Sequence, residues 1–177
     1  MGESDRLGTW TVALNLPDFE VVQLAEDEVK NVLRFTVVPR LAVGVCPHCG
    51  STSGNIRQKR EREGSDLPLG GRRVKLKIRV FQFACPWCRK CFTPPSPAIA
   101  EGTRATKRLL EGAATLIRHG DITSTAAFFG LSEKTLERWY YDCVERQQRQ
   151  PDTELQPIEA IGIDELSLKK STGSMLP

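Results

Sequence analysis

Two pairs of cysteines have the spacing of metal ligands. The sequence CPHCG starts at Cys46, and the sequence CPWCRKC starts at Cys85. Each pair supplies two thiolates from one tight turn, which the proline after the first cysteine favours. Two such turns predict one tetrahedral structural zinc ion without an open position for catalysis. The predicted ligands are Cys46, Cys49, Cys85 and Cys88.

Two alternatives exist for these cysteines. Two disulfides would need an oxidising compartment, and nothing in the sequence indicates one. Cys91 lies three residues beyond the second pair, so we expect a spare thiol there. Replacement of Cys88 by Cys91 as the fourth ligand stays open.

The distribution of charge indicates a nucleic-acid partner. The net charge is only +3, but residues 46–100 contain 11 basic and 3 acidic residues. Clustered lysine and arginine bind phosphate with release of counterions. The first residues, MGESDRLGTW, lack the basic region and apolar run expected of a signal peptide, and no apolar run reaches the roughly 18 residues of a membrane span. We therefore expect a soluble cytoplasmic protein without membrane contact.

The region before the first cysteine pair reads as strands. Phe19–Leu24 and Val29–Val38 are rich in β-branched and apolar residues, and we expect them to form a hairpin. Ala42–Val45 is a short strand that leads into the first metal turn. Residues 1–18 have no clear pattern.

A basic strand leads into the second cysteine pair. After a polar, basic segment (Ser51–Arg62) and a turn at Gly70-Gly71, apolar residues alternate with cations, as in a strand with two different faces. We expect the apolar face to pack beside the metal and the basic face to be free for phosphates. The candidate DNA contacts on this strand are Arg72, Arg73, Lys75, Lys77 and Arg79.

The period becomes helical after a linker at residues 93–102. The pattern predicts helices over Thr103–Gly120, Ser124–Phe129 and Glu133–Gln150, the last two joined by a tight turn at residues 130–132. This is the helix-turn-helix arrangement, in which the start of the second helix contacts base edges. We expect Leu131, Leu136 and Trp139 to form its core. The exposed candidates for DNA contact are Ser132, Lys134 and Arg138.

The last segment contains one carboxylate in a suggestive place. After a second linker at residues 151–157, a short strand (Ala160–Ile163) ends in Asp164-Glu165. Two-metal phosphoryl transfer needs several carboxylates, so Asp164 alone is not an active site.

These elements give an α+β chain in five parts. We expect an N-terminal β-hairpin region (1–41), a zinc ribbon (42–92), a linker (93–102), a helix-turn-helix domain (103–150) and a C-terminal segment (151–177).

The order of motifs resembles the ISL-three family of bacterial insertion-sequence transposases. The matching stretches are CPHCGS, DLPLGG with the basic strand, FACPWC, the helix-turn-helix and IGIDELSLKK. The resemblance implies a zinc-binding domain, a DNA-binding helical domain and the first strand of a ribonuclease-H-like catalytic domain. By this resemblance Asp164 is the first acid of an Asp-Asp-Glu triad.

The chain departs from the family after this motif. It continues as STGSMLP, and the second Asp and the Glu are absent. We therefore expect a truncated transposase that binds double-stranded DNA on the bacterial nucleoid, at transposon terminal inverted repeats, and is not an enzyme alone. Such a fragment would compete with full-length transposase for the ends, or dimerise with it or with itself. The alternatives are a zinc-ribbon transcription regulator or protein-interaction module, and the N-terminal part of an active transposase completed by another reading frame.

Overall fold

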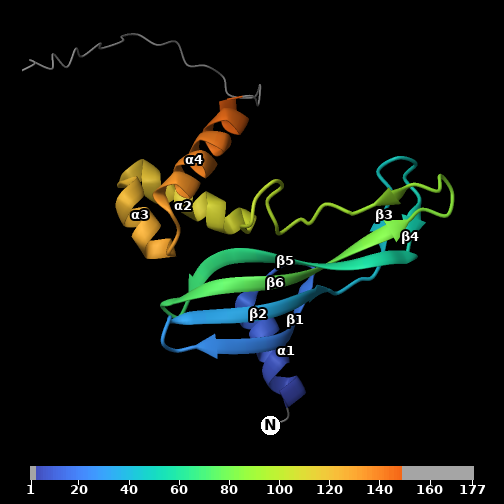
Figure 1. Cartoon of the computed structure of the whole chain (residues 1–177), viewed down its shortest axis with the longest axis horizontal. Coiled ribbons are helices and arrows are strands. Elements are labelled where there is room, and N and C mark those ends of the chain that lie inside the picture. Colours follow the sequence, from blue (N-terminus) through green and yellow to red (C-terminus); the bar gives the residue numbers. More distant parts are fainter. Residues whose placement is uncertain (1–2, 149–177) are drawn as a thin grey trace, which may run out of the picture.

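A computed structural model describes residues 3–148 as a β-sheet with one helix on its face and three helices beside its edge (Figure 1). The elements in chain order are α1 (Glu3–Leu14), β1 (Phe19–Asp27), β2 (Val32–Pro39), β3 (Gly44–Val45), β4 (Thr52–Ser53), β5 (Ile56–Leu69), β6 (Arg72–Ala84), β7 (Cys91–Phe92), α2 (Lys107–His119), α3 (Ile122–Phe129) and α4 (Glu133–Gln148). The mixed α+β class that the sequence predicted is confirmed, with one helix before the strands and three helices after them.

The main sheet joins the N-terminal hairpin to β6, the strand that leads to the second cysteine pair. Its order is β1-β2-β6-β5, and β7 pairs with the end of β6. The predicted hairpin forms, because β1 and β2 pair antiparallel. β2 also pairs with β6 in parallel, from Val32 opposite Arg73 to Val37 opposite Ile78. The hairpin therefore shares one sheet with β6, whereas β3, which leads to the first cysteine pair, forms a separate two-stranded sheet with β4.

The apolar side chains of β6 belong to a core formed with β2 and α1. The parallel register places Val74 beside Leu33 and Leu76 beside Phe35, all on one face of the sheet. Helix α1 covers this face, and its Trp10 ring lies 5.7 Å from the ring of Phe35. The expectation that this apolar face packs beside the metal is wrong. The sequence also gave no sign of α1, because its residues lack a strong apolar stripe.

Strand β5 was not predicted. Its first half is polar on both faces and exposed, so the alternation that marks a half-buried strand is missing. The backbone pairs antiparallel with β6 over almost its whole length, from Ile56 opposite Phe83 to Leu69 opposite Arg72. The predicted turn at Gly70-Gly71 closes this hairpin, and both glycines have the positive φ that suits them to it.

The three helices follow the predicted order with small shifts at their ends. Asp121 caps α3, since its carboxylate accepts a hydrogen bond of 2.7 Å from the backbone of Ser124. Gly130 ends α3 in the left-handed conformation at φ 62°. Leu136 and Trp139 are buried between the helices and Leu131 packs against them, as expected.

The helices are attached to the sheet by backbone and side-chain bonds. Ser65 of β5 donates its N–H to Arg104 and accepts at its carbonyl from Thr106, at 2.9 and 3.0 Å. The carboxylate of Asp66 is fully buried beside this joint, and it accepts hydrogen bonds from the Thr106 hydroxyl and the Arg108 guanidinium. Since these bonds join α2 to β5, the helical part sits in a fixed place on the sheet.

The predictions for the C-terminal segment lie outside the described residues. These are the strand at Ala160–Ile163 and the carboxylate of Asp164. Within residues 3–148, no helix is long and apolar enough to cross a membrane.

Candidate metal centre and nucleic-acid interface

The four predicted cysteines meet at one end of the sheet. Their sulfur atoms all lie within 4.8 Å of one another. Across the two turns, the Sγ atoms of Cys46 and Cys88 are 3.6 Å apart, and those of Cys49 and Cys85 are 3.5 Å apart. The first pair follows β3 and the second follows β6, so two separate hairpins converge on one point.

The two turns have the same backbone hydrogen bonds. Gly50 N–H donates to the carbonyl of Cys46 at 2.8 Å, and Arg89 N–H donates to the carbonyl of Cys85 at 3.0 Å. Both Gly50 and Arg89 have positive φ, at 75° and 59°. Each turn therefore points its two thiols to the same side, which is the geometry that a shared tetrahedral ion needs.

A small apolar cluster packs against the buried cysteines. The rings of Phe83 and Phe92 are stacked with centroids 5.8 Å apart, and both are buried with Cys46 and Cys85. A Cβ atom at Gly44 would lie 2.8 Å from Pro94 Cγ, so only glycine fits where β3 crosses this cluster. The site is therefore held by packing as well as by its own turns.

The four thiols differ in acidity. Hydrogen bonds from the side chain and backbone of Ser51 lower the pKa of Cys49 to about 6, and bonds from two other cysteines add to this. At Cys88 the backbone N–H of Lys90 favours the thiolate, but burial and the three neighbouring cysteines together raise the pKa to about 11. Thiolates at such short distances repel one another, and a bound dication offsets this repulsion and stabilises the deprotonated form. The cluster suits one structural Zn²⁺ held by four thiolates.

Cys91 is not part of the cluster. It lies on β7, and its sulfur accepts a hydrogen bond of 3.5 Å from the guanidinium of Arg57. Because Cys88 lies within the group of four, the alternative ligand set is not the one that the structure shows.

The start of α4 presents the polar side chains expected of a recognition helix. Ser132, Lys134 and Arg138 are all exposed, while Leu136 between them is buried. Ser132 caps the helix, since its hydroxyl accepts a hydrogen bond of 3.3 Å from the backbone of Thr135. The geometry thus leaves the first turn of α4 open to a ligand.

Three cations of β6 are less free than predicted. Arg72 lies 2.6 Å from Glu26, and Lys77 lies 2.8 Å from Glu61, which is also 4.0 Å from Arg79. The expectation of a free basic face is wrong, because the neighbouring strand β5 places Glu61 beside Lys77 and Arg79. Arg72 and its partner Glu26 lie on the other face of the sheet, with Leu33. Exposed pairs of this kind contribute only about 0–1 kcal/mol, so a phosphate can replace the carboxylate.

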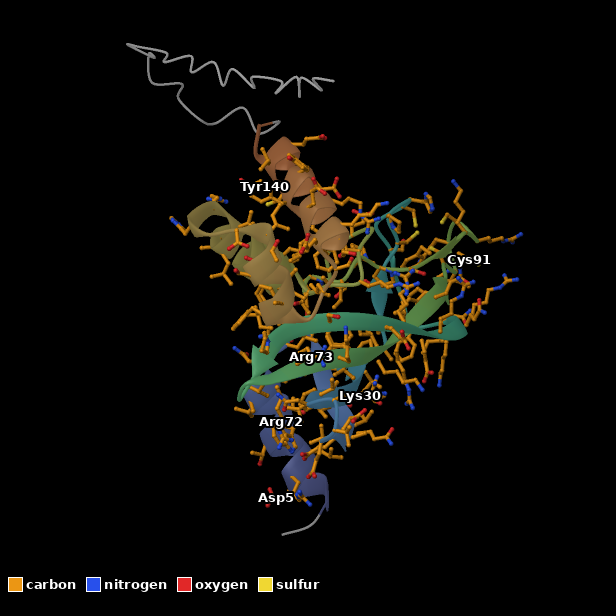
Figure 2. The ribbon with its side chains drawn as sticks, turned by 60° about the vertical axis from the view of Figure 1, so that its left-hand side comes forward. Asp5, Lys30, Arg72, Arg73, Cys91 and Tyr140 are labelled. Atoms are coloured by element: carbon orange, nitrogen blue, oxygen red, sulfur yellow. The ribbon has the colours of Figure 1, made fainter. Side chains whose placement is uncertain are left out.

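Arg73 and Lys75 bond to neutral groups instead. The guanidinium of Arg73 donates to the carbonyl of Lys30 at 2.8 Å, and Figure 2 shows these two residues at the same end of the sheet. The ammonium of Lys75 donates to the Ser65 hydroxyl at 2.8 Å. Burial lowers the pKa of Lys75, and repulsion by Arg73 and Arg34 adds to the effect.

Sequence reasoning missed two cations on the same polar face, Arg34 and Arg104. Arg34 belongs to the N-terminal part of the chain, which has more acidic than basic residues, so the net charge there did not indicate a phosphate ligand. The alternation of Leu33, Arg34 and Phe35 along β2 was the signal for its polar orientation. Arg104 is held beside the sheet by the hydrogen bond that its carbonyl accepts from the N–H of Ser65. No local sequence pattern indicates this contact.

Comparison with protein families agrees with this geometry. Residues 42–88 match the zinc-finger of transposase IS204/IS1001/IS1096/IS1165, and residues 94–144 match the helix-turn-helix domain of transposase family ISL3. No curated protein and no solved structure gives a significant match. The two matched domains contain the four-cysteine cluster and the α3–α4 pair. The chain therefore contains the zinc ribbon and the helix-turn-helix domain of ISL3-family transposases, in that order.

Proposed function

We propose that this chain recognises the terminal inverted repeats of a transposon as double-stranded DNA, through the first turn of α4. The observation that carries the proposal is the exposure of Ser132, Lys134 and Arg138 beside a buried Leu136. In a helix-turn-helix this part of the second helix enters the major groove. Lys134 and Arg138 have the donors that guanine edges and phosphates accept.

Zinc contributes no chemistry in this proposal. When bound by the four cysteines, the ion fixes the two turns, and all four tetrahedral positions are taken by sulfur. The turns fix the ends of β5 and β6 next to the metal, at Ile56 and Ala84. The helical part is bound near the other end of β5, at Ser65 and Asp66.

The chain of 177 residues is proposed to bind DNA without cutting or joining it. Asp164 resembles the first acid of a transposase triad, as the end of a strand remnant of a ribonuclease-H-like domain, but two-metal chemistry needs further carboxylates around the ions. Full-length transposase or a second copy of the chain are the proposed protein partners at the DNA ends. Binding there would place the chain on the bacterial nucleoid.

The DNA proposal is tested by comparing substitutions on α4. We expect Arg138→Gln to weaken binding to the element's terminal repeats by about 1–3 kcal/mol and to reduce the preference over random duplex. Fluorescence anisotropy at two salt concentrations measures both. Arg118→Gln is the matched control, because this exposed cation lies outside α4, in the last turn of α2. Equal losses for the two variants, or no preference of the native chain for the repeats, would contradict recognition by α4.

Catalysis is tested separately with the same protein. Incubation with labelled repeat ends and Mg²⁺ or Mn²⁺ should leave the DNA intact. Cleavage or strand transfer by the purified chain would overturn this part of the proposal.

A further inference from the structure

The polar face of the sheet is hollowed beside the joint with the helices. The depression has a volume of about 410 Å³. Its charged and hydroxyl-bearing walls come from β2, β5, β6 and the segment before α2: they are Arg34, Thr36, Glu63, Ser65, Lys75, Lys77 and Arg104. Strands that are far apart in the sequence thus direct four cations and one carboxylate to one hollow.

Three of these cations form no ion pair within residues 3–148. The ion pairs of the described residues include none with Arg34, Lys75 or Arg104, although Lys77 pairs with Glu61. Lys75 is half-buried, and its ammonium bonds to the hydroxyl of Ser65 rather than to an anion. Cations gathered in a partly desolvated hollow repel one another, and a bound anion relieves this repulsion.

The hollow is connected to the recognition helix through Arg73. Arg73 lies two residues before Lys75 on the same face of β6. Its side chain packs against Gly130 in the turn between α3 and α4, where any added Cβ would collide with the guanidinium. Figure 1 shows this turn close to the end of the sheet where β5 and β6 meet. The hollow and the start of α4 are therefore joined through one side chain.

We propose that this hollow binds the phosphodiester backbone of the same duplex that α4 contacts, with Arg34, Lys75 and Arg104 as the phosphate ligands. The proposal rests on DNA binding by the helix-turn-helix. It assigns to the sheet a direct part in holding DNA, beyond its support of the zinc turns.

The experiment uses the full chain and random duplexes of about 10 and about 20 base pairs, roughly one and two helical turns. Affinity falls as salt rises, and each phosphate contact makes the slope of log affinity against log salt more negative by about 0.9. The double variant Arg34→Gln/Arg104→Gln should therefore reduce the magnitude of this slope by about 2 on the longer duplex, and by less on the shorter one. Arg6→Gln is the control, since this exposed cation lies on α1, across the sheet.

A second variant gives a change of opposite sign. Glu63→Gln removes the carboxylate that opposes phosphate in the hollow, and we expect several-fold tighter binding of the longer duplex. This result does not depend on the double variant being well folded. Unchanged affinity in Glu63→Gln, together with an unchanged slope in the double variant, would overturn the proposal.

Two further outcomes separate the possible causes. If Arg138→Gln weakens binding while the variants of the hollow have no effect, DNA recognition by α4 stands and only the role of the sheet is refuted. If inorganic phosphate displaces the duplex more strongly than chloride at equal ionic strength, and only in proteins with an intact hollow, the hollow is a small-anion site and the backbone assignment is wrong.

Discussion

At the scale of single residues, Arg108 makes the most connected set of bonds. It pairs with the buried Asp66 and also donates to the carbonyls of Leu14 and Asn15, at 2.6 and 2.9 Å. Its hydrogen bond with Asp66 raises the pKa of the guanidinium, against the effect of partial burial. One cation therefore holds together the end of α1, strand β5 and the start of α2.

Substitution of Arg108 by Gln should destabilise the protein strongly. The carboxylate of Asp66 is fully buried, and removal of its partner leaves an uncompensated charge. We expect a loss of about 3 kcal/mol, the lower end of the range for buried pairs, since the Arg108 side chain is 32% exposed. Urea denaturation measures the change. Lys107→Gln, the exposed neighbour, should change stability by less than about 0.5 kcal/mol, and similar losses in both would refute this role.

Two glycine substitutions should have opposite effects. Gly130 has φ 62° and contacts Arg73, so Gly130→Ala combines about 1–2 kcal/mol of backbone strain with a collision. Gly8 lies inside α1 with open space around it, so Gly8→Ala should stabilise by about 0.5–1 kcal/mol. Thermal melting of the two variants provides the comparison. A neutral Gly130→Ala would mean that Arg73 does not constrain the turn.

At the scale of elements, the zinc site consists of two similar turns that follow strands of very different length. The first follows a strand of only two residues, β3, and the second follows the long strand β6. Backbone hydrogen bonding is the same in both, so the difference lies in what each turn is attached to. The short first arm depends more on the metal for its position than the second does.

Cysteine substitutions should separate ligands from the spare thiol. Cys46→Ser should lose the zinc and open the two turns at the metal end of the sheet, because a structural ion contributes on the order of 10 kcal/mol to such modules. Cys91→Ser should keep one zinc per chain, since its sulfur lies outside the cluster. Metal analysis by mass spectrometry distinguishes the two. Loss of zinc from Cys91→Ser would revive the alternative ligand set.

The elements that could be predicted are those with a local pattern. The cysteine spacing, the alternation along β6 and the helical period after residue 103 each gave the correct element. Strand β5 could not be found, because its pairing with β6 rather than its own side chains makes it a strand. The position of Asp66 could not be found either, since its partner Arg108 lies 42 residues further along the chain. Contacts between distant segments leave no periodic signal.

At the scale of the whole molecule, three separate cores share one sheet. One lies between α1 and the sheet, one among α2, α3 and α4, and one under the cysteines. Strand β6 connects the first and the third, because Leu76 belongs to one and Phe83 to the other. The centre of the sheet therefore has a stabilising core that does not include the metal.

Removal of zinc should open only the end of the sheet. After treatment with a chelator, hydrogen exchange should accelerate at residues 44–56 and 81–92 and stay slow at 74–78, where β6 lies between β2 and β5. Hydrogen exchange followed by mass spectrometry measures this. Uniform loss of protection across all of β6 would show that the metal holds the entire sheet.

The parallel pairing of β2 with β6 has a consequence for biosynthesis. Leu33 meets Val74 only after the ribosome has made the whole connection between them, so the sheet closes late and the loop-closure entropy is large. Cys85 follows directly after β6, and the second half of the metal site thus leaves the ribosome just behind the strand that completes the sheet. Until then the nascent hairpin has only α1 to cover Phe35 and Val37. The sheet should therefore close before the metal site is complete, and a shortage of zinc during translation should leave only its metal end open to aggregation.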